Sequence, residues 1–275
     1  MRQDDFRLAR NVRVLCWLLV PFWTTLGYAS TVEFNDLVPN YIGLGVGSTS
    51  QWSGSTDSLV GAVPGMRVKL ENNRYAEWAG PFMAVKVNTH PNFEFGPIAL
   101  LHLGRNDVDN EKVKHLPDID FGLSMGGYVG YRITKTDTTI PFSSRFGMTA
   151  STAVAGDTKG SNLGIYANTW VPLSYQLFVG LGVGATFADD KYMQHYYGVD
   201  SEASLLTGIS EFDAAGGNRQ VYLWPAVLYQ VTPSWYVGAA MFYQRLTGDA
   251  AKSSIVKEQG SKNQYTYGVG IGYAW

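Results

Sequence analysis

The sequence predicts an all-β protein, an antiparallel transmembrane β-barrel of about twelve strands. Three observations support this fold class: segments in which large apolar residues alternate with glycine, a basic and apolar leader, and short turns that alternate with long polar segments. A period of two residues is the signature of a β-strand, because successive side chains point to opposite faces. In a transmembrane barrel the large residues meet lipid and the small or polar residues line the lumen.

The strongest alternation lies in residues 265–275, which read YTYGVGIGYAW. One face carries Tyr, Val, Ile and Trp, and the other carries mostly glycine. Each glycine weakens a strand by roughly 0.5–1 kcal/mol relative to alanine, and a soluble sheet would place polar side chains on its outer face. Tyr273 and Trp275 are expected to join the aromatic girdle at the membrane interface and to form the membrane-insertion terminus.

The same alternation recurs in residues 42–47, 121–132 and 177–187. Arg132, Gln176 and Thr186 fall on the glycine-bearing face, which indicates that this face is wet. Mean hydropathy is only −0.08 despite 31 Gly, 17 Tyr and 8 Trp. That combination is typical of a barrel, whose apolar residues are spread over alternate positions.

The N-terminus predicts export. Four arginines precede an apolar run from Val14 to Leu26, and Gly27 and Ala29 are small, so residues 1–29 are expected to be a signal peptide cleaved after Ala29. A retained signal anchor is the alternative. Residues 30–275 would then form one outer-membrane β-barrel domain. Cys16, the single cysteine, lies in the leader, so the processed chain would have no disulfide and no thiolate metal site.

The charge balance gives no sign of nucleic-acid binding. The chain has 21 Lys and Arg against 23 Asp and Glu, a net charge of −2, and loss of the leader's four Arg and two Asp makes it −4. Such a balance lacks the basic patch that nucleic acid requires. After the leader, no stretch approaches the 18 apolar residues of a helical membrane span.

Turn signals divide the chain into eleven evident runs. Treating 75–80 as a separate short strand gives twelve, and ten or fourteen strands are the alternatives. The long polar segments 106–118, 189–215 and 248–262 are then external, and short turns such as 134–139 and 232–234 are periplasmic. The runs lie near residues 39–49, 62–71, 80–89, 93–105, 119–133, 140–154, 163–173, 175–188, 216–231, 234–247 and 264–275.

One group of residues could support hydrolysis. Asp189 and Asp190 end a predicted strand and His195 follows, and carboxylates near a histidine can activate water. The alternative is a solvated loop with ordinary charges. The histidines at 90, 102 and 115 are scattered and suggest neither a metal set nor a Ser and His pair. We therefore predict no catalytic residue, no metal ligand and no cofactor.

Two long segments, 194–217 and 245–256, predict ordered external loops, the first with a short helix over residues 201–206. They also resemble the MipA/OmpV proteins of Gram-negative outer membranes. The family pattern is matched by an aromatic pair with Gly and Val, a small-residue stretch, a Gly-Gly pair and a Gly-Asp-Ala sequence. Ser254 stands where proline is usual. The matching positions are Tyr196, Tyr197, Gly198, Val199, Ser204, Gly216, Gly217, Gly248, Asp249, Ala250 and Ser253.

The resemblance implies a non-enzymatic scaffold in the outer membrane, with lipid around it and murein enzymes as partners. The implied partners are a murein lytic transglycosylase and a penicillin-binding protein, two enzymes that act together in peptidoglycan synthesis and remodelling. No family residue known to contact a partner can be transferred, so the periplasmic turns 134–139 and 232–234 are the candidate surfaces. Three alternatives remain: a narrow channel or osmoregulated porin, for which Arg132 is one sign, a surface adhesin that uses loop 189–215, and a hydrolase.

Overall fold

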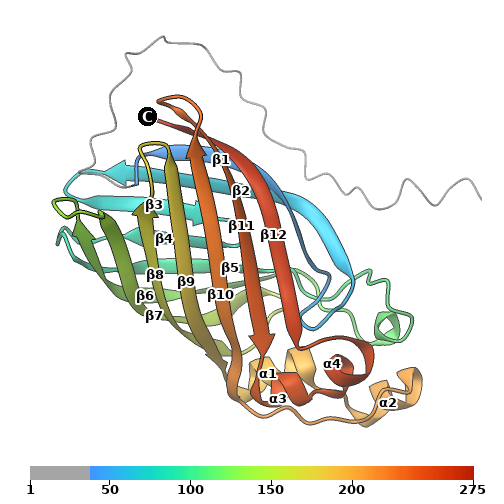
Figure 1. Ribbon diagram of the computed structural model, residues 1–275. Coiled ribbons are helices and arrows are strands. Elements are labelled where there is room, and N and C mark those ends of the chain that lie inside the picture. The colour runs from blue at the N-terminus through green and yellow to red at the C-terminus, as the bar shows by residue number, and fades with distance from the viewer. Residues whose placement is uncertain (1–37) are drawn as a thin grey trace, which may run out of the picture.

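The computed structural model describes residues 38–275, and the signal-peptide prediction for residues 1–29 lies outside them. Twelve strands form one closed antiparallel barrel in which each strand pairs with the next and β12 pairs with β1 (Figure 1). The predicted strand number and antiparallel order are confirmed. The bounds are β1 Tyr41–Ser50, β2 Ser58–Leu70, β3 Arg74–Ala79, β4 Phe82–Lys86, β5 Phe93–His102, β6 Gly122–Lys135, β7 Phe142–Gly156, β8 Ser161–Pro172, β9 Leu177–Ala188, β10 Gly217–Gln230, β11 Trp235–Leu246 and β12 Asn263–Ala274.

The first and last strands meet along a seam of glycines. Gly45 lies opposite Gly270, and the next pairs on the same face, Gly43 with Gly272 and Gly47 with Gly268, are also glycine with glycine. The large residues of both strands point outward, and Leu44 and Val269 are each 60% exposed. The alternation in the sequence therefore has the orientation that lipid outside and a lumen inside require.

The hairpin of β3 and β4 is much shorter than the other strands. β3 has six residues, in the segment expected as the extra strand, and β4 has five. β2 pairs with β3 only from Gly65 to Leu70, so within the described chain residues 58–64 of β2 have a strand partner, β1, on one side only. The Gly80 N–H at the hairpin tip donates to the Pro64 carbonyl at 2.9 Å.

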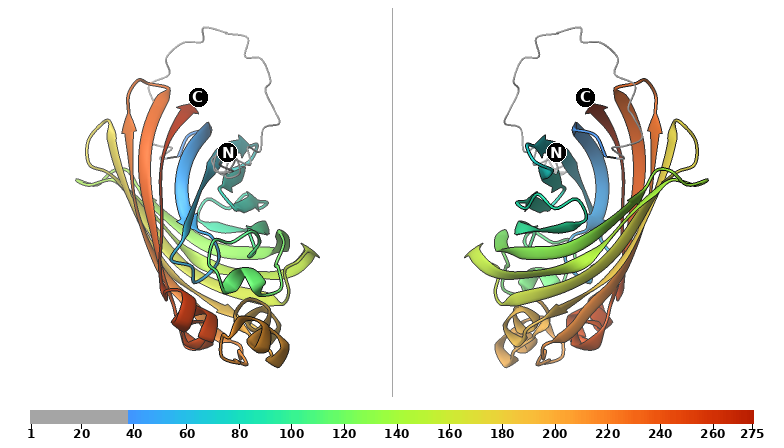
Figure 2. Two further views of the ribbon diagram at one scale, coloured as in Figure 1. Left: turned by 90° about the vertical axis from the view of Figure 1, so that its right-hand side faces the viewer. Right: turned by 90° about the vertical axis from the view of Figure 1, so that its left-hand side faces the viewer.

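Helices gather at one end of the barrel, and the C-terminus lies at the opposite end (Figures 1 and 2). They are the short 3-10 helix η1 (Val113–His115) and the α-helices α1 (Asp190–Tyr197), α2 (Ser201–Thr207), α3 (Gly248–Lys252) and α4 (Ser254–Gln259). The helix expected over 201–206 is confirmed as α2. The expectation of a loop over 248–262 is wrong for residues 248–259, because helices of five and six residues are too short to show a helical period in sequence.

The outer surface of the barrel is apolar between two sets of aromatic residues. Trp235 packs edge-on against Tyr273 near the C-terminal end, with ring centroids 5.2 Å apart, and Tyr243 lies 5.1 Å from Tyr265 near the helical end. Ten of the twelve strands have 10–15 residues, which is enough to cross the apolar part of a bilayer. None of the helices within residues 38–275 is long and apolar enough to cross a membrane.

Candidate functional site in the lumen and at the external mouth

Charged side chains gather inside the barrel near the ends of β2 to β7 that lie away from the helices. Arg145 Nη1 donates to Glu77 Oε1 at 2.9 Å, and Arg67 Nη1 donates to the other oxygen of Glu77 at 3.0 Å. Glu94 is 1% exposed, and it accepts from Arg132 Nε at 2.7 Å and lies 2.8 Å from Arg145 Nε. We call these five residues with Tyr75 and Lys86 the lumen cluster.

Tyr75 and Lys86 complete the lumen cluster. The Tyr75 hydroxyl donates to Glu94 Oε2 at 3.0 Å, and the Arg67 guanidinium lies 3.7 Å from the centre of the Tyr75 ring. Lys86 Nζ donates to the His90 carbonyl at 2.7 Å and forms no ion pair within the described chain. Four cations thus face two carboxylates, and the cluster has a surplus of two positive charges.

The opposite part of the inner wall is aromatic. On β8, β10 and β11 large rings point inward and lie against the glycines of β9. The Trp224 ring occupies the space that a Cβ on Gly182 would need, 2.2 Å away, and Trp170 does the same at Gly180. Trp170 and Trp224 lie 6.0 Å apart, and Tyr222 stacks on Phe242 at 5.1 Å. The glycines of β9 therefore make room for inward aromatic rings.

The segments at the helical end pack into one body with its own hydrophobic core, which we call the external cap. It joins residues from the loops after β1, β5, β9 and β11. Its most deeply buried side chains are Val113, Met193, Tyr197, Ile209, Leu246, Ala250, Ile255 and Val256. Burial in this core raises the pKa of Tyr192, whose hydroxyl accepts from Arg219 Nη1 at 2.6 Å.

The two sequence segments that resemble the MipA/OmpV pattern meet in the external cap. Ser253 Oγ donates to the Tyr197 carbonyl at 2.7 Å, and the Tyr197 hydroxyl lies 2.7 Å from Ser53 Oγ. Val199 forms an isolated β-bridge with Phe212. The motif positions therefore join segments that are far apart in the chain.

Hydrogen bonds from backbone N–H groups to carboxylates also hold the two motif segments, 194–217 and 245–256, in place. The Gly216 N–H donates to Asp190 Oδ1 at 2.6 Å, and the Ala215 N–H donates to Asp249 Oδ2 at 3.1 Å. Gly248 has φ of 52°, and a Cβ there would lie 2.6 Å from the Asn218 carbonyl oxygen, so only glycine fits. The other motif positions lie in or beside the cap, at Tyr196, Gly198, Ser204, Gly217 and Ala250.

The Asp249 carboxylate holds α3 against this junction by accepting from the Ala215 N–H, and it also accepts from Lys252 within α3. Lys252 Nζ donates to Asp249 Oδ1 at 3.0 Å. The bond from Lys252, then the bond from the Ala215 N–H, lowers the pKa of the Asp249 carboxyl below its ordinary value. The charged form of Asp249 therefore stabilises the folded cap.

The three residues considered for hydrolysis have structural partners. Asp189 caps α1 by accepting from the Tyr192 N–H at 2.9 Å, and Asp190 holds the Gly216 N–H. His195 Nε2 lies 2.9 Å from the Asp157 carbonyl oxygen and 3.6 Å from Asp157 Oδ1, so its carboxylate neighbour is Asp157 and neither Asp189 nor Asp190. These contacts are those of helix capping and loop packing, and they do not bring His195 together with Asp189 and Asp190 as a catalytic group.

The remaining histidines form no metal site. His102 Nε2 lies 2.9 Å from Ser124 Oγ, and His115 Nδ1 lies 2.9 Å from the Glu111 carbonyl. Within residues 38–275 no group of three His, Cys, Asp or Glu side chains could hold a metal ion.

Sequence reasoning placed Arg132 on the lumen face but did not find its partners. Glu94 lies 38 positions away from Arg132, and Glu77 lies 68 positions away from Arg145. A usable signal existed, since each charged residue stands at an inward position of an alternating strand. Their mutual approach depends on strand register around the barrel.

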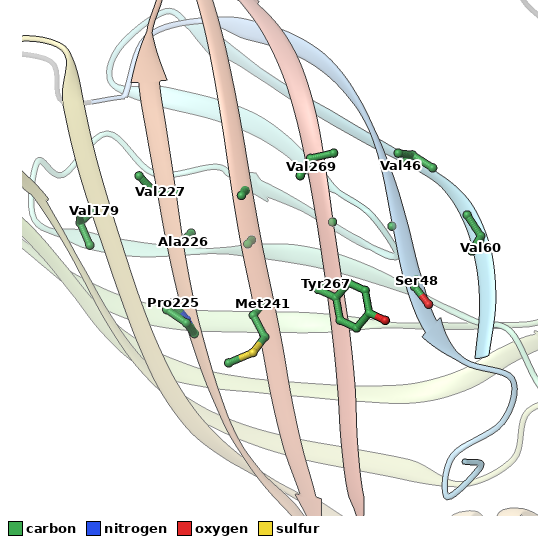
Figure 3. Close-up of a pocket in the computed structure, with 14 residues that line it drawn as sticks. Val46, Ser48, Val60, Val179, Pro225, Ala226, Val227, Met241, Tyr267 and Val269 are labelled. Carbon is green, nitrogen blue, oxygen red and sulfur yellow. The ribbon is translucent and has the colours of Figure 1, made fainter. Parts of the chain in front are cut away.

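A shallow apolar hollow lies on the outer surface, across strands β9 to β12, β1 and β2 (Figure 3). Val46, Val227 and Val269 line it, and Met241 and Tyr267 border it on the same outer face. Its lining residues belong to the apolar band of the outer surface.

A closed twelve-stranded barrel with an apolar exterior, a charged lumen and long segments at one end defines the class of transmembrane β-barrels. The chain belongs to the family described as "MltA-interacting protein MipA", whose model matches residues 42–275. No curated protein matches the chain.

Solved structures with a similar arrangement include several outer-membrane proteins. An outer membrane channel from Pseudomonas putida F1 has 11% identity and a TM-score of 0.49, with 86% of this chain and 96% of that chain covered. The translocator domain of the autotransporter NalP from Neisseria meningitidis has 11% identity and a TM-score of 0.41, with 87% and 90% covered. Outer membrane phospholipase A from Escherichia coli has 9% identity and a TM-score of 0.32, with 86% and 93% covered.

Proposed function

We propose that this protein is a non-enzymatic scaffold in the Gram-negative outer membrane that binds a murein lytic transglycosylase and brings it together with a penicillin-binding protein. The observation that carries the proposal is the family match over residues 42–275, because the family's description names an interaction with MltA. Export by the expected signal peptide, residues 1–29, belongs to the same proposal.

The binding surface of a scaffold for murein enzymes has to face the periplasm. Transmembrane barrels have short periplasmic turns and long external loops, which makes the end opposite the cap the periplasmic one. Two turns expected to bind a partner lie there, one between β6 and β7 and one between β10 and β11. Ile140, directly after the expected 134–139 turn, is 63% exposed, and Val231, directly before the expected 232–234 turn, is 51% exposed. Exposed aliphatic side chains on turns are suitable contacts for a partner.

The contacts of Asp189, Asp190 and His195 support a scaffold without catalysis, because all three side chains are engaged in holding the cap. We propose that the motif positions serve the fold of the cap. We also propose that Tyr273 and Trp275 act as the membrane-insertion terminus, a role that suits their stacked rings, 6.2 Å apart.

Two alternatives have one supporting observation each. A narrow channel is favoured by inward aliphatic side chains that are accessible to solvent, since Val63 is 43% exposed and Leu228 is 37% exposed. An adhesin is favoured by α2, where Leu205 and Leu206 are 89% and 66% exposed at the external end. Bilayer conductance of the purified barrel tests the channel.

Capture from solution tests the scaffold. The tagged barrel, in detergent, is incubated with a purified lytic transglycosylase of the MltA type and with a penicillin-binding protein, and bound protein is quantified. The same aliphatic-to-acid change is made at both ends: Ile140→Asp in the periplasmic turn and Leu206→Asp on α2. We expect Ile140→Asp to weaken capture about tenfold, as for a buried aliphatic anchor, and Leu206→Asp to leave it unchanged.

The opposite pattern would contradict the scaffold. If neither murein enzyme is captured above an unrelated barrel, or if only Leu206→Asp reduces capture, then the periplasmic end is not the binding surface. In the second case host-surface binding by the Leu206→Asp variant would be measured next.

A further inference from the structure

The wall of the barrel is incompletely paired beside β2. Strand β3 ends at Ala79, opposite Gly65, so Ser58–Val63 pairs with β1 and has no strand on its other side within the described chain. These six residues of β2 extend roughly 20 Å. The β3–β4 hairpin does not reach the height of these residues in the wall. β2 and the chain that continues β5 are therefore separated there by three strand spacings, about 14 Å.

Hydrogen-bonded segments frame this gap on its other sides. The hairpin tip lies at one end, where the Leu101 N–H of β5 donates to the Pro81 carbonyl at 2.9 Å. At the other end the loop after β5 reaches across to the loop after β1, and the Asp109 N–H donates to Gln51 Oε1 at 3.0 Å. The gap is therefore a framed window in the half of the wall next to the cap.

The lumen is accessible directly behind this window. Gly61 points inward from the unpaired segment of β2, and a Cβ added there would meet nothing within 4 Å. Val63, the next inward residue, is 43% exposed. Backbone polar groups exposed to lipid are costly, so water or the polar part of a ligand is required along this edge.

Further along the lumen from the window, toward the end away from the cap, two inner walls differ in chemistry. The lumen cluster forms one of these walls, and its Arg132 and Arg145 side chains keep 17% and 14% solvent exposure. On the other side lie the inward rings of Trp170 and Trp224 and the partly exposed side chain of Leu228. A surplus of positive charge next to an aromatic wall complements a molecule with one anionic head and one long apolar chain.

We propose that the window between β2 and β5 is a lateral opening through which the lumen takes up a single-chain amphiphile with an anionic head group from the membrane. The head group binds at Arg132 and Arg145, and the chain lies along the aromatic wall of β8 to β11. The cap lies at the end of the barrel above this site. This activity does not depend on the scaffold function, since it uses the lumen and not the periplasmic turns.

Photo-crosslinking of the full barrel tests the site. The protein is placed in phosphatidylcholine nanodiscs with palmitic acid that carries a diazirine on its chain, and labelled residues are mapped by mass spectrometry. The methyl ester of the same probe is the neutral control. We expect the acid to label the inward residues Trp170, Trp224 and Leu228, and the ester to label outward residues such as Val60 only.

Variants separate the opening from the charge. Gly61→Trp and Val63→Trp each place a ring behind the window and should abolish inward labelling, whereas Gly61→Ala should not. Lys86→Gln removes half of the surplus charge without breaking an ion pair and should weaken inward labelling about fivefold. Lys159→Gln, in an exposed turn between β7 and β8, is its matched control.

Three outcomes would overturn the proposal. Equal inward labelling by acid and ester would remove the role of charge, and inward labelling that survives both tryptophan variants would remove the window. Failure of both unlabelled palmitate and a single-chain phosphate monoester to compete would show that no anionic head group is bound. If only palmitate or only the phosphate monoester reduces inward labelling, the bound head group is a carboxylate or a phosphate, respectively. Heat-dependent migration on a gel confirms that each variant is folded.

Discussion

At the scale of single residues, the glycines of the seam serve close backbone approach. A Cβ on Gly45 would lie 2.8 Å from the Val269 carbonyl oxygen, a distance that real Cβ atoms do not adopt. At Gly272 the nearest such atom would be the Ile42 carbonyl oxygen at 3.6 Å, an ordinary contact. Two glycines that look equivalent in the sequence thus have different tolerance for a side chain.

Alanine at these two positions should have opposite effects. Gly45→Ala should lower the stability of the barrel by about 1–3 kcal/mol because backbone must shift, whereas Gly272→Ala should be neutral or stabilising by up to about 1 kcal/mol. Urea unfolding in lipid vesicles, followed by tryptophan fluorescence, measures both. Equal effects would show that the seam is not tightly packed.

Glu94 is the residue on which the lumen cluster depends most. It is 1% exposed and contacts Arg132, Arg145 and Tyr75. Glu94→Gln would leave two buried guanidinium groups without their carboxylate, so we expect a loss of about 3 kcal/mol in the same unfolding assay. Glu111→Gln, which breaks an exposed pair with Lys114, should leave stability unchanged. If Glu94→Gln lowers the free energy of unfolding no more than Glu111→Gln does, the lumen cluster does not contribute to stability.

At the scale of elements, the sequence predicted strands better than the cap. Strands of ten or more residues repeat the two-residue period often enough to be recognised. The six-residue β3 was expected because an even number of strands places every long segment at the same end of the barrel. Of the cap helices only α2 was expected. α1, α3 and α4 are held by contacts between segments, such as Ser253 with Tyr197 across 56 positions, which no local pattern shows.

Acid should loosen the cap through Asp249. The folded pKa of this carboxyl lies below its unfolded value, so its stabilisation is present above the ordinary value near 4 and is lost as pH falls through the folded pKa. Asp249→Asn should speed hydrogen exchange in residues 247–259 severalfold at neutral pH, and the difference from the unaltered protein should shrink below about pH 4.

Asp213→Asn is the matched control for this experiment, because Asp213 is an exposed cap residue with no hydrogen bond to another described residue. Exchange in its variant should equal that of the unaltered protein at every pH. A difference between Asp249→Asn and the unaltered protein that stays constant down to pH 3 would contradict the assignment.

At the scale of the whole molecule, the two ends of the barrel differ in kind. The helical end is a packed body with its own core. The other end has short turns, and the first and last described residues lie there. The difference in segment length between the two ends followed from the sequence. The lumen cluster and the window did not, because both depend on which residues of different strands reach the same height around the wall.

The seam also determines the order of events in assembly. Thr49 and Thr266 are 217 positions apart, yet their hydroxyl oxygens lie 2.8 Å from each other across it. Bringing chain segments together over such a separation costs about 5 kcal/mol in loop-closure entropy, far more than for neighbouring strands joined by short turns. Hairpins should therefore form early and the seam last. Until residues 263–274 arrive, β1 keeps a free edge, and a chain whose export stalls there is an open sheet that another strand can join.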